Sequence, residues 1–299
     1  MTRELLKTGK HSITAITRKD SNSKLPAGIK VATVDYTNPQ TVVEALQNQD
    51  ALIITLSAFA HDAQATLLQA AADAQVPWVL PNEYSPDSAH EGLLQDVPIL
   101  GNLKQAREQI EKTGKNSWLG VSCGFWYEWS MAIPLAFGFD YGNRAVTLFG
   151  DGETLTSVST WPQVGRAVTA LLSLPVKSEG GNADACLETY RNRMVYINSF
   201  TVTQRQMFGS VLRVTGTREE EWKVTKQPVE ERYEEGNAEM EAGDRDGMVK
   251  AMYSRVFFPD DAGNFEKTRG TLNGVLGLPE EDMDEATATA IEMSKKPLY

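Results

Sequence analysis

The stretch that decides the fold is HSITAITRKD, His11 to Asp20. Within it, residues 12–17 alternate polar and apolar side chains and are rich in β-branched residues, which predicts a short strand. A helix-like run over residues 2–8 precedes the strand, with a glycine between the two as a helical stop. This order of helix, glycine and strand is typical of the second strand of a nucleotide-binding βαβ unit. Here the strand ends in two cations, Arg18 and Lys19.

The two cations also indicate which dinucleotide such a unit would bind. An acidic residue at this place hydrogen-bonds the ribose 2′-hydroxyl of NAD, whereas an arginine accommodates the 2′-phosphate of NADP. Arg18 and Lys19 therefore predict NADP as the cofactor.

The sequence begins at Met1, inside the helix that normally follows the first strand and its glycine-rich turn. That strand and turn would occupy roughly 15 residues. In the strand order 3-2-1-4-5-6 the first strand is central, so we expect strands two and four to face a gap about 10 Å wide. Three arrangements are open: the protein is longer than this sequence, strand two closes directly against strand four, or another chain donates a strand. A start without the turn would weaken or remove cofactor binding.

Length and charge limit the classes of protein that need to be considered. The 299 residues suffice for one large or two modest domains with an ample core. A formal net charge of −11 argues against a nucleic-acid or anionic-membrane partner, because phosphate binding needs a basic face. More than half of this excess of negative charge lies between Thr217 and Gly247, a segment with eleven Asp and Glu residues and five Lys and Arg residues. We expect that segment to be a solvated surface.

Cysteines and histidines give no sign of a metal site or a disulfide framework. Cys123 and Cys186 are far apart without a CxxC pattern, and the three histidines have no metal-ligand spacing. Met1 is followed by charged residues rather than by an apolar signal region, and no apolar run is long enough to span a membrane. We therefore expect no metal and a reduced, cytoplasmic compartment.

Short β-branched or apolar runs alternate with amphipathic runs through the first half of the chain. Such alternation predicts an α/β fold, a Rossmann-type doubly wound parallel sheet with its first strand missing. Turn residues at 149–152 mark a boundary, so we expect an NAD(P)-binding domain over residues 1–150 and a smaller α-rich substrate lobe over residues 151–299. The further strands are expected at 29–35, 51–56, 76–80, 118–122, 145–149 and 194–198, and the further helices at 39–47, 61–75, 101–113, 162–174, 203–214, 247–257 and 282–293.

Several motifs occur in a characteristic order. They are AITRKDS, SAFAHDAQATLLQAA, VPWVLPNEYSPD with NLKQAREQIE after it, VSCGFWYEW, LFGDGETLTSVSTWPQVGRAVTALL and SFTVTQRQMFGSVLRVTG. Together they resemble the NmrA-like, isoflavone-reductase-like branch of the atypical short-chain dehydrogenases, from Met1 to about Leu278. The Tyr-x-x-x-Lys pair of the typical branch occurs at none of the tyrosines, in agreement with this resemblance.

In that family the loop after the fifth strand reads roughly F-x-P-S-E-F, and a lysine on the next helix stands by the nicotinamide. This chain has LPNEY at 80–84, and the helix lysine falls on Lys104. The resemblance implies that Lys104 is the catalytic residue, since burial lowers the pKa of a lysine toward neutrality. Without the resemblance, Lys104 reads as an exposed helix lysine.

The resemblance also implies a set of cofactor contacts. Arg18 and Lys19 would hold the 2′-phosphate, Ser57 and Gln64 would lie near the cofactor, and Pro81 and Asn82 would line the nicotinamide pocket. Tyr84 belongs either to that wall or to the packed core.

Two further patterns have alternative readings. Trp126, Tyr127 and Trp129 would either wall an apolar substrate cleft or form the core between the lobes. The string GVSCG, 120–124, fits a Gly-x-Ser-x-Gly nucleophile elbow, but that elbow needs a later histidine and all three histidines come before Ser122. We interpret it as a chance match.

The sequence as a whole predicts an NADP-dependent reductase of a small apolar or aromatic metabolite. One alternative is a non-catalytic NAD(P)-sensing regulator that acts on a protein partner, a behaviour also found in this family. Another is a cofactor-free remnant that keeps the fold but not the glycine-rich loop.

Overall fold

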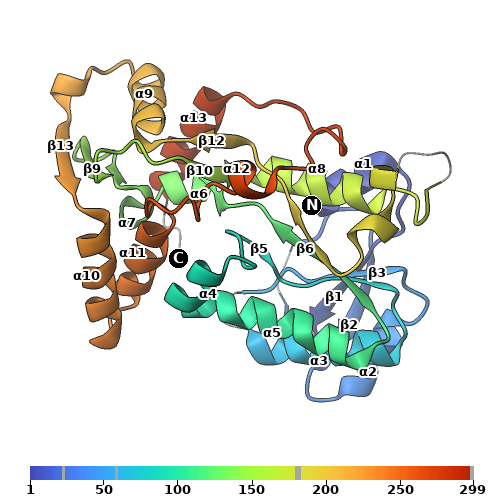
Figure 1. Ribbon diagram of the computed structural model, residues 1–299. Coiled ribbons are helices and arrows are strands. Elements are labelled where there is room, and N and C mark those ends of the chain that lie inside the picture. The colour runs from blue at the N-terminus through green and yellow to red at the C-terminus, as the bar shows by residue number, and fades with distance from the viewer. Residues whose placement is uncertain (22–23, 58–59, 179–182, 297–299) are drawn as a thin grey trace.

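The computed structural model describes residues 1–21, 24–57, 60–178 and 183–296. A parallel sheet with helices on both faces forms one part of the molecule, and a smaller lobe of helices and short strands lies beside it (Figure 1). The expected mixed α/β, Rossmann-like fold is thereby confirmed. No helix within the described ranges is long and apolar enough to cross a membrane.

The main sheet is parallel and its central strands are buried. Its order is β11-β6-β4-β3, with β5 paired to β6 beyond the end of β4. Every residue of β4 and β6 is buried, as expected for a parallel sheet that is covered on both faces. The strands are β3 (Ala51–Ile53), β4 (Trp78–Leu80), β5 (Tyr84–Ser85), β6 (Ser117–Ser122) and β11 (Arg193–Tyr196).

Helices cover the two faces of this sheet (Figure 1). One apolar cluster joins the sheet to α2, α3 and α5, and a second joins it to α8, against which α1 packs. The helix expected before the first predicted strand is present, and it ends at Gly9. These helices are α1 (Thr2–Thr8), α2 (Pro39–Leu46), α3 (His61–Asp73), α5 (Pro98–Thr113) and α8 (Trp161–Leu172).

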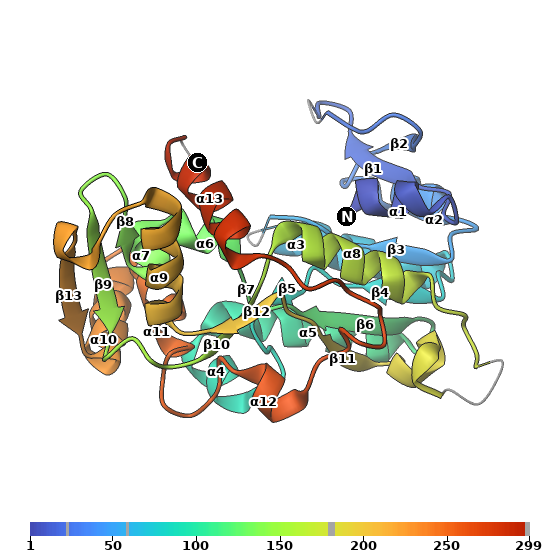
Figure 2. The ribbon, with the colours of Figure 1, turned by 90° about the horizontal axis from the view of Figure 1, so that it is seen from above.

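The strand that carries Arg18 belongs to a separate small sheet. β1 (Thr14–Arg18) pairs in parallel with β2 (Lys30–Val34), and these two strands lie apart from β3 in Figure 2. Among the described residues, no strand pairs with the second edge of β1 or of β3. The arrangement in which strand two closes against strand four is therefore wrong for this structure, whereas the expected unpaired edges are present.

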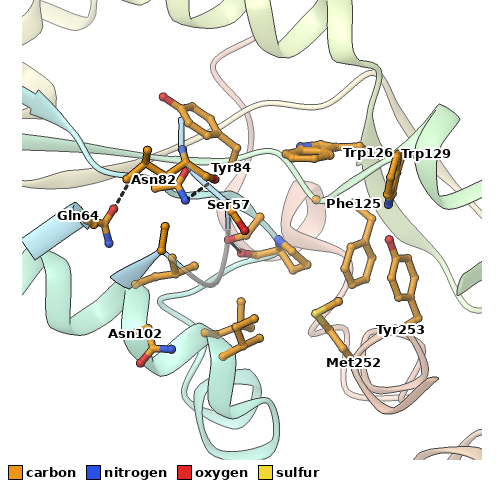
Figure 3. Close-up of a pocket in the computed structure, with 18 residues that line it drawn as sticks. Ser57, Gln64, Asn82, Tyr84, Asn102, Phe125, Trp126, Trp129, Met252 and Tyr253 are labelled. Atoms are coloured by element: carbon orange, nitrogen blue, oxygen red, sulfur yellow. Dashed lines mark hydrogen bonds between the residues drawn. The ribbon is translucent and has the colours of Figure 1, made fainter. Parts of the chain in front are cut away.

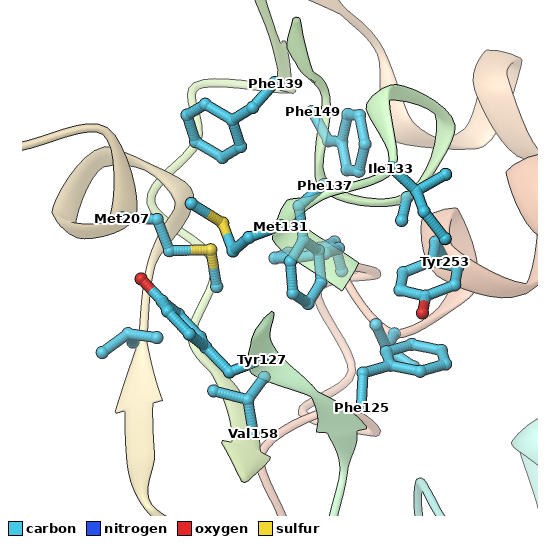
Figure 4. Packing of buried hydrophobic residues seen from close by; sticks show 14 of the residues in the cluster. Phe125, Tyr127, Met131, Ile133, Phe137, Phe139, Phe149, Val158, Met207 and Tyr253 are labelled. Atoms are coloured by element: carbon cyan, nitrogen blue, oxygen red, sulfur yellow. The ribbon is translucent and has the colours of Figure 1, made fainter. Parts of the chain in front are cut away.

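The smaller lobe has its own aromatic core (Figure 4). Phe137 packs edge-on against both Tyr253 and Phe257, and Phe139 and Phe208 belong to the same buried cluster. The lobe's elements are α6 (Tyr127–Met131), α7 (Pro134–Phe137), β8 (Phe139–Asp140), β9 (Ala145–Phe149), α9 (Gln204–Thr215), β13 (Lys223–Gln227), α10 (Val229–Glu241), α11 (Arg245–Arg255) and α13 (Met283–Ser294).

Short elements connect the sheet to the lobe. β10 pairs with both β7 and β12. In the sequence, α4 precedes these three strands and α12 follows them. Three 3-10 turns cover residues 183–185, 187–190 and 219–221. The connecting elements are β7 (Phe125–Trp126), β10 (Thr156–Ser159), β12 (Phe200–Val202), α4 (Glu91–Asp96) and α12 (Phe265–Arg269).

The boundary expected at residue 150 does not coincide with these two parts. β9 was expected in the main sheet, but it lies in the sheet of the lobe between β8 and β13. Conversely, α8 and β11 follow residue 150 and yet pack on or pair with the main sheet. The chain crosses between the parts more than once, so no single cut separates them. The acidic segment forms β13 and α10, and α10 is exposed apart from the few residues that face α11.

Candidate functional site

A cavity of about 310 Å³ opens beyond the carboxyl ends of β3, β4 and β6 (Figure 3). Ligands bind at this edge in open α/β sheets. The loops after the strands, α5, α6 and α11 all contribute side chains, so the cavity lies between the sheet and the lobe. The residues that line the cavity include Ser57, Gln64, Asn82, Tyr84, Ile99, Asn102, Leu103, Phe125, Trp126, Trp129, Met252 and Tyr253.

Asn82 ties two of the strand ends together. Its Oδ1 accepts the N–H of Leu56 at 3.1 Å, and its Nδ2 donates to the carbonyl oxygen of Leu56 at 2.9 Å. The side-chain amide thus continues the pairing between chain segments just past the end of β3.

Gln64 on α3 is fixed by the same loop. Its Oε1 accepts the backbone N–H of Asn82 at 2.9 Å, and the residue is 8% exposed (Figure 3). Because the oxygen is used inside the protein, the amide nitrogen is the atom of Gln64 with hydrogen-bonding capacity for a ligand.

Gly124 sets the course of the chain after β6. Its φ is 66°, and a Cβ at this position would overlap the carbonyl oxygen of Ser157 on β10. Only glycine permits both the positive φ and the close approach. The turn delivers Phe125 and Trp126 to the cavity wall.

Aromatic rings form the wall on the side of the lobe (Figure 3). Phe125 stacks on Tyr253 of α11, with ring centroids 3.8 Å apart and planes 14° apart. The hydroxyl of Tyr253 shares a hydrogen bond of 2.8 Å with Ser130 Oγ. Trp126 and Trp129 complete this wall, and Ile99 and Leu103 of α5 also line the cavity.

None of the described residues that line the cavity carries a formal charge. Burial holds the pKa of Tyr84 well above its ordinary value, and its buried hydroxyl has no hydrogen-bond partner within the described chain. Burial also raises the pKa of the neighbouring Cys123 to about 12. Both groups are therefore neutral near pH 7, and the cavity suits a flat, uncharged group.

A buried ion pair lies next to the loop that carries Asn82 and Tyr84. Glu83 is fully buried and accepts hydrogen bonds from Arg107 of α5 and from Ser88. Burial raises the pKa of Glu83 to about 7, against the opposing effect of the Arg107 guanidinium. The pair fixes α5 to the loop that carries Asn82 and Tyr84.

The structure does not bring Lys104 to the cavity. Its side chain is 57% exposed, and Nζ lies 3.9 Å from Glu108 Oε1 on the next turn of α5. Asn102 and Leu103 line the cavity instead. One residue further along a helix the side chain is turned by about 100°, which directs Lys104 away from the cavity.

The other expected contacts divide into three groups. Ser57, Gln64 and Asn82 line the cavity, whereas Pro81 is buried and does not line it. At the end of β1, Lys19 is exposed and Arg18 is 69% exposed, with its Nε 3.7 Å from Asp20. Arg18 and Lys19 are thus accessible to a ligand, but neither is a wall of this cavity.

The structure also shows where the residues of the aromatic pattern and of the GVSCG string lie. Trp126, Trp129 and Tyr84 line the cavity, but Tyr127 is fully buried in the lobe and bonds Thr287. Ser122 is fully buried, which agrees with a chance match to the nucleophile elbow.

Several lining residues had no signal in the sequence, among them Met252 and Tyr253. Met252 and Tyr253 lie on α11, whose apolar pattern predicted a helix but not the partner of each face. Within the described part of the chain, no group of three or more His, Cys, Asp or Glu residues could hold a metal ion.

Comparisons with known proteins agree with this geometry. The NAD(P)H-binding family model matches residues 1–82. The oxidoreductase aprR of Aspergillus flavus is 27% identical over 94% of this chain and 90% of its own length. Isoflavone reductase has a TM-score of 0.70 at 15% identity, covering 95% of this chain and 94% of its own. The NADPH-dependent quinone oxidoreductase QOR2 of Escherichia coli has a TM-score of 0.69 at 16% identity, covering 97% of this chain and 94% of its own.

The family match and the relatives agree on one class, the NAD(P)H-dependent oxidoreductases. The chain has an NAD(P)H-binding domain by the family model, and its structural neighbours lie in the isoflavone-reductase-like group of atypical short-chain dehydrogenases. The resemblance seen in the sequence is thereby confirmed in its fold and in its NAD(P)H-binding domain. The donor set fits such a cofactor, since amide and hydroxyl groups meet at the cavity and two accessible cations follow β1.

Proposed function

We propose that the protein is an NADP-dependent reductase of a small, flat acceptor that is apolar or aromatic. The observation that carries this proposal is the uncharged, aromatic cavity at the carboxyl ends of the parallel strands, beside Gln64 and Asn82. The match of residues 1–82 to an NAD(P)H-binding family supports it.

Two groups of residues would hold the cofactor. Arg18 and Lys19 would take the 2′-phosphate, and Ser57 and Gln64 would lie at the nicotinamide. Asn82 would act by fixing the loop at Leu56, because both ends of its amide are already bonded there. When bound, the cofactor supplies a hydride.

The chain itself binds and orients the acceptor. Phe125 and Trp126 would lie on one side of a flat ring and Leu103 on the other, and this apolar wall excludes water. Because no described lining residue is charged, the site suits an acceptor whose reduced anion takes its proton from bulk water on leaving the cavity. A quinone has this property, and quinone reduction is what the structurally similar QOR2 is named for.

The test is oxidation of NADPH and of NADH in the presence of 1,4-benzoquinone. We expect turnover with preference for NADPH, and Gln64→Leu should raise KM for NADPH about tenfold through loss of its amide. Gln69→Leu is the matched control on the same helix, since Gln69 is exposed and bonds Asp73. Binding of neither dinucleotide would overturn the proposal and favour a cofactor-free remnant.

A catalytic role for Lys104 remains a prediction from the resemblance, and it has its own test. Because its side chain is exposed and lies by Glu108, we expect Lys104→Ala to change kcat by less than about twofold. A loss of about a hundredfold would mean that α5 turns this lysine toward the substrate.

One observation favours the alternative of an NAD(P)-sensing regulator. No acid or base lines the described part of the cavity, and a sensor needs none. Tight NADPH binding by calorimetry with no turnover of any quinone would support the sensor over the reductase.

A further inference from the structure

We propose that Trp126 and Trp161 form an outer aromatic subsite that binds a second ring of the substrate. This inference rests on the proposed function of the cavity as a reductase site. It assigns a specificity-determining role to Trp161, which does not itself line the cavity.

The two indoles are exposed at the mouth of the cavity. Trp126 is 36% exposed and Trp161 is 43% exposed, and their ring centroids are 6.1 Å apart. Trp129 also lines the cavity, and its ring is likewise 6.1 Å from that of Trp161. Trp126 and Trp129 are both part of the cavity wall drawn in Figure 3. The aromatic surface is therefore continuous from the cavity to the outside.

Exposed indoles in contact with a cavity are a binding feature. Each large aromatic side chain gains free energy when an apolar partner covers it, and stacked aromatic pairs gain more than the buried area alone. Tryptophan is also enriched among the residues that dominate binding energies. A second ring on Trp126 and Trp161 would bury surface that the free protein leaves in water.

The backbone of Trp161 is held in place independently of any ligand. Trp161 begins α8, and its N–H donates to Glu128 Oε2 at 3.1 Å. Glu128 is 5% exposed and lies on α6, the helix that carries Trp129. Thr160 caps α8 by accepting the N–H of Gln163 at 3.1 Å, and its own hydroxyl donates to Glu281. The subsite is preorganised, so a ligand does not have to order it.

The surroundings determine the charge of the second ring. The carboxylates of Glu128 and Glu281 lie close to the start of α8, and the chain has a net charge of −11. Arg166 pairs with Glu281 and offsets its charge, so the repulsion of an anionic ring rests on Glu128 and on the net charge of the chain, whereas a neutral ring is accepted. The substrate class is thus a neutral acceptor with a second aryl group. For a quinone, the hydride goes from NADPH to the quinone and a proton comes from water, giving the hydroquinone and NADP⁺.

The experiment compares two acceptors that differ by one ring. Steady-state kinetics with 1,4-benzoquinone and with 2-phenyl-1,4-benzoquinone are measured for the wild type and for Trp161→Ala. We expect KM for the phenyl compound to rise about tenfold and KM for benzoquinone to stay unchanged. Trp161→Phe should restore most of the difference. Val176→Ala, an equally exposed apolar residue at 49%, is the control and should change neither value.

A second readout needs neither cofactor nor turnover. Calorimetry with 2-phenylhydroquinone, the product, should show binding that weakens about tenfold in Trp161→Ala. If this holds and no quinone is reduced, the proposed function fails while the subsite stands. Equal KM changes for both acceptors, or no change for either, would overturn the subsite. A shift in sedimentation for Trp161→Ala without a change in KM would also overturn it, because the indoles would then join two copies of the chain.

Discussion

Asn82 and Glu83 show that the site depends on polar atoms that do not face the substrate. The amide of Asn82 is used on the backbone of Leu56, and the carboxylate of Glu83 is used on Arg107 and Ser88. Both residues act by holding a loop in one conformation. Such bonds matter because a buried polar group left unpaired costs on the order of 1 to 3 kcal/mol.

Glu83 should make the stability of the fold depend on pH. Burial raises its pKa from 4.5 to about 7 in the folded chain. Between these values the folded chain holds a proton that the unfolded chain has lost, so the free energy of unfolding falls as pH rises from about 4.5 to about 7. The loss is on the order of 3 kcal/mol, at 1.36 kcal/mol for each pKa unit.

Urea unfolding at several pH values checks this expectation. Glu83→Gln does not titrate, so its unfolding free energy should fall less over the same pH range. Above pH 7 its stability should also be lower than that of the wild type, because Arg107 there lacks its charged partner. Glu108→Gln, at an exposed position on the helix of Arg107, should keep the wild-type slope. Identical slopes for the wild type and Glu83→Gln would contradict the assignment.

Among the elements, the pair α10 and α11 decides where one cavity wall stands. α11 carries Met252 and Tyr253, and it crosses α10 where Gly236 faces Gly247. A Cβ at Gly236 would come within 2.6 Å of the backbone nitrogen of Ala251. The missing side chains therefore let the two helix backbones approach each other.

Gly247→Ala should push these helices apart. Its Cβ would overlap backbone atoms of α10, so we expect a loss of about 1 to 3 kcal/mol of unfolding free energy and weaker substrate binding as Tyr253 moves. Gly101→Ala in α5 is the matched control, since nothing lies within 4 Å of a Cβ there. That variant should gain about 0.5 to 1 kcal/mol, as alanine does in a helix interior. Thermal melts of both variants measure the difference, and equal melting temperatures would refute this account.

The type of an element was predictable from its local sequence pattern, whereas the element that it packs against or pairs with was not. The periodicity at 39–47 and 61–75 predicted α2 and α3 closely, because an amphipathic stripe is a property of one segment. β9 has a strand pattern, but its pairing with β13 depends on a segment more than seventy residues later. Whether Lys104 faces the cavity was unpredictable for a similar reason, since a shift of one residue on a helix decides between the cavity and solvent.

Across the whole molecule, the expected cofactor contacts lie on two sheets. Ser57 and Gln64 belong to the edge of the main sheet, while Arg18 ends β1 in the separate two-stranded sheet. The small sheet is connected to the rest mainly through packing of α2 on α3 and of α1 on α8. A dinucleotide held at both ends would therefore join two parts that few strand hydrogen bonds connect.

This arrangement predicts uneven hydrogen exchange. A two-stranded sheet is marginal on its own, and β1 and β2 are mostly half-buried or exposed, whereas β6 is buried throughout. Amides of Thr14–Arg18 should thus exchange faster than those of Ser117–Ser122. Adenosine carrying a 2′-phosphate should slow exchange in β1 and β2 by pairing with Arg18 and Lys19, and the same nucleoside without that phosphate should not. Equal protection by both nucleosides, measured by mass spectrometry, would mean that these cations do not select NADP over NAD.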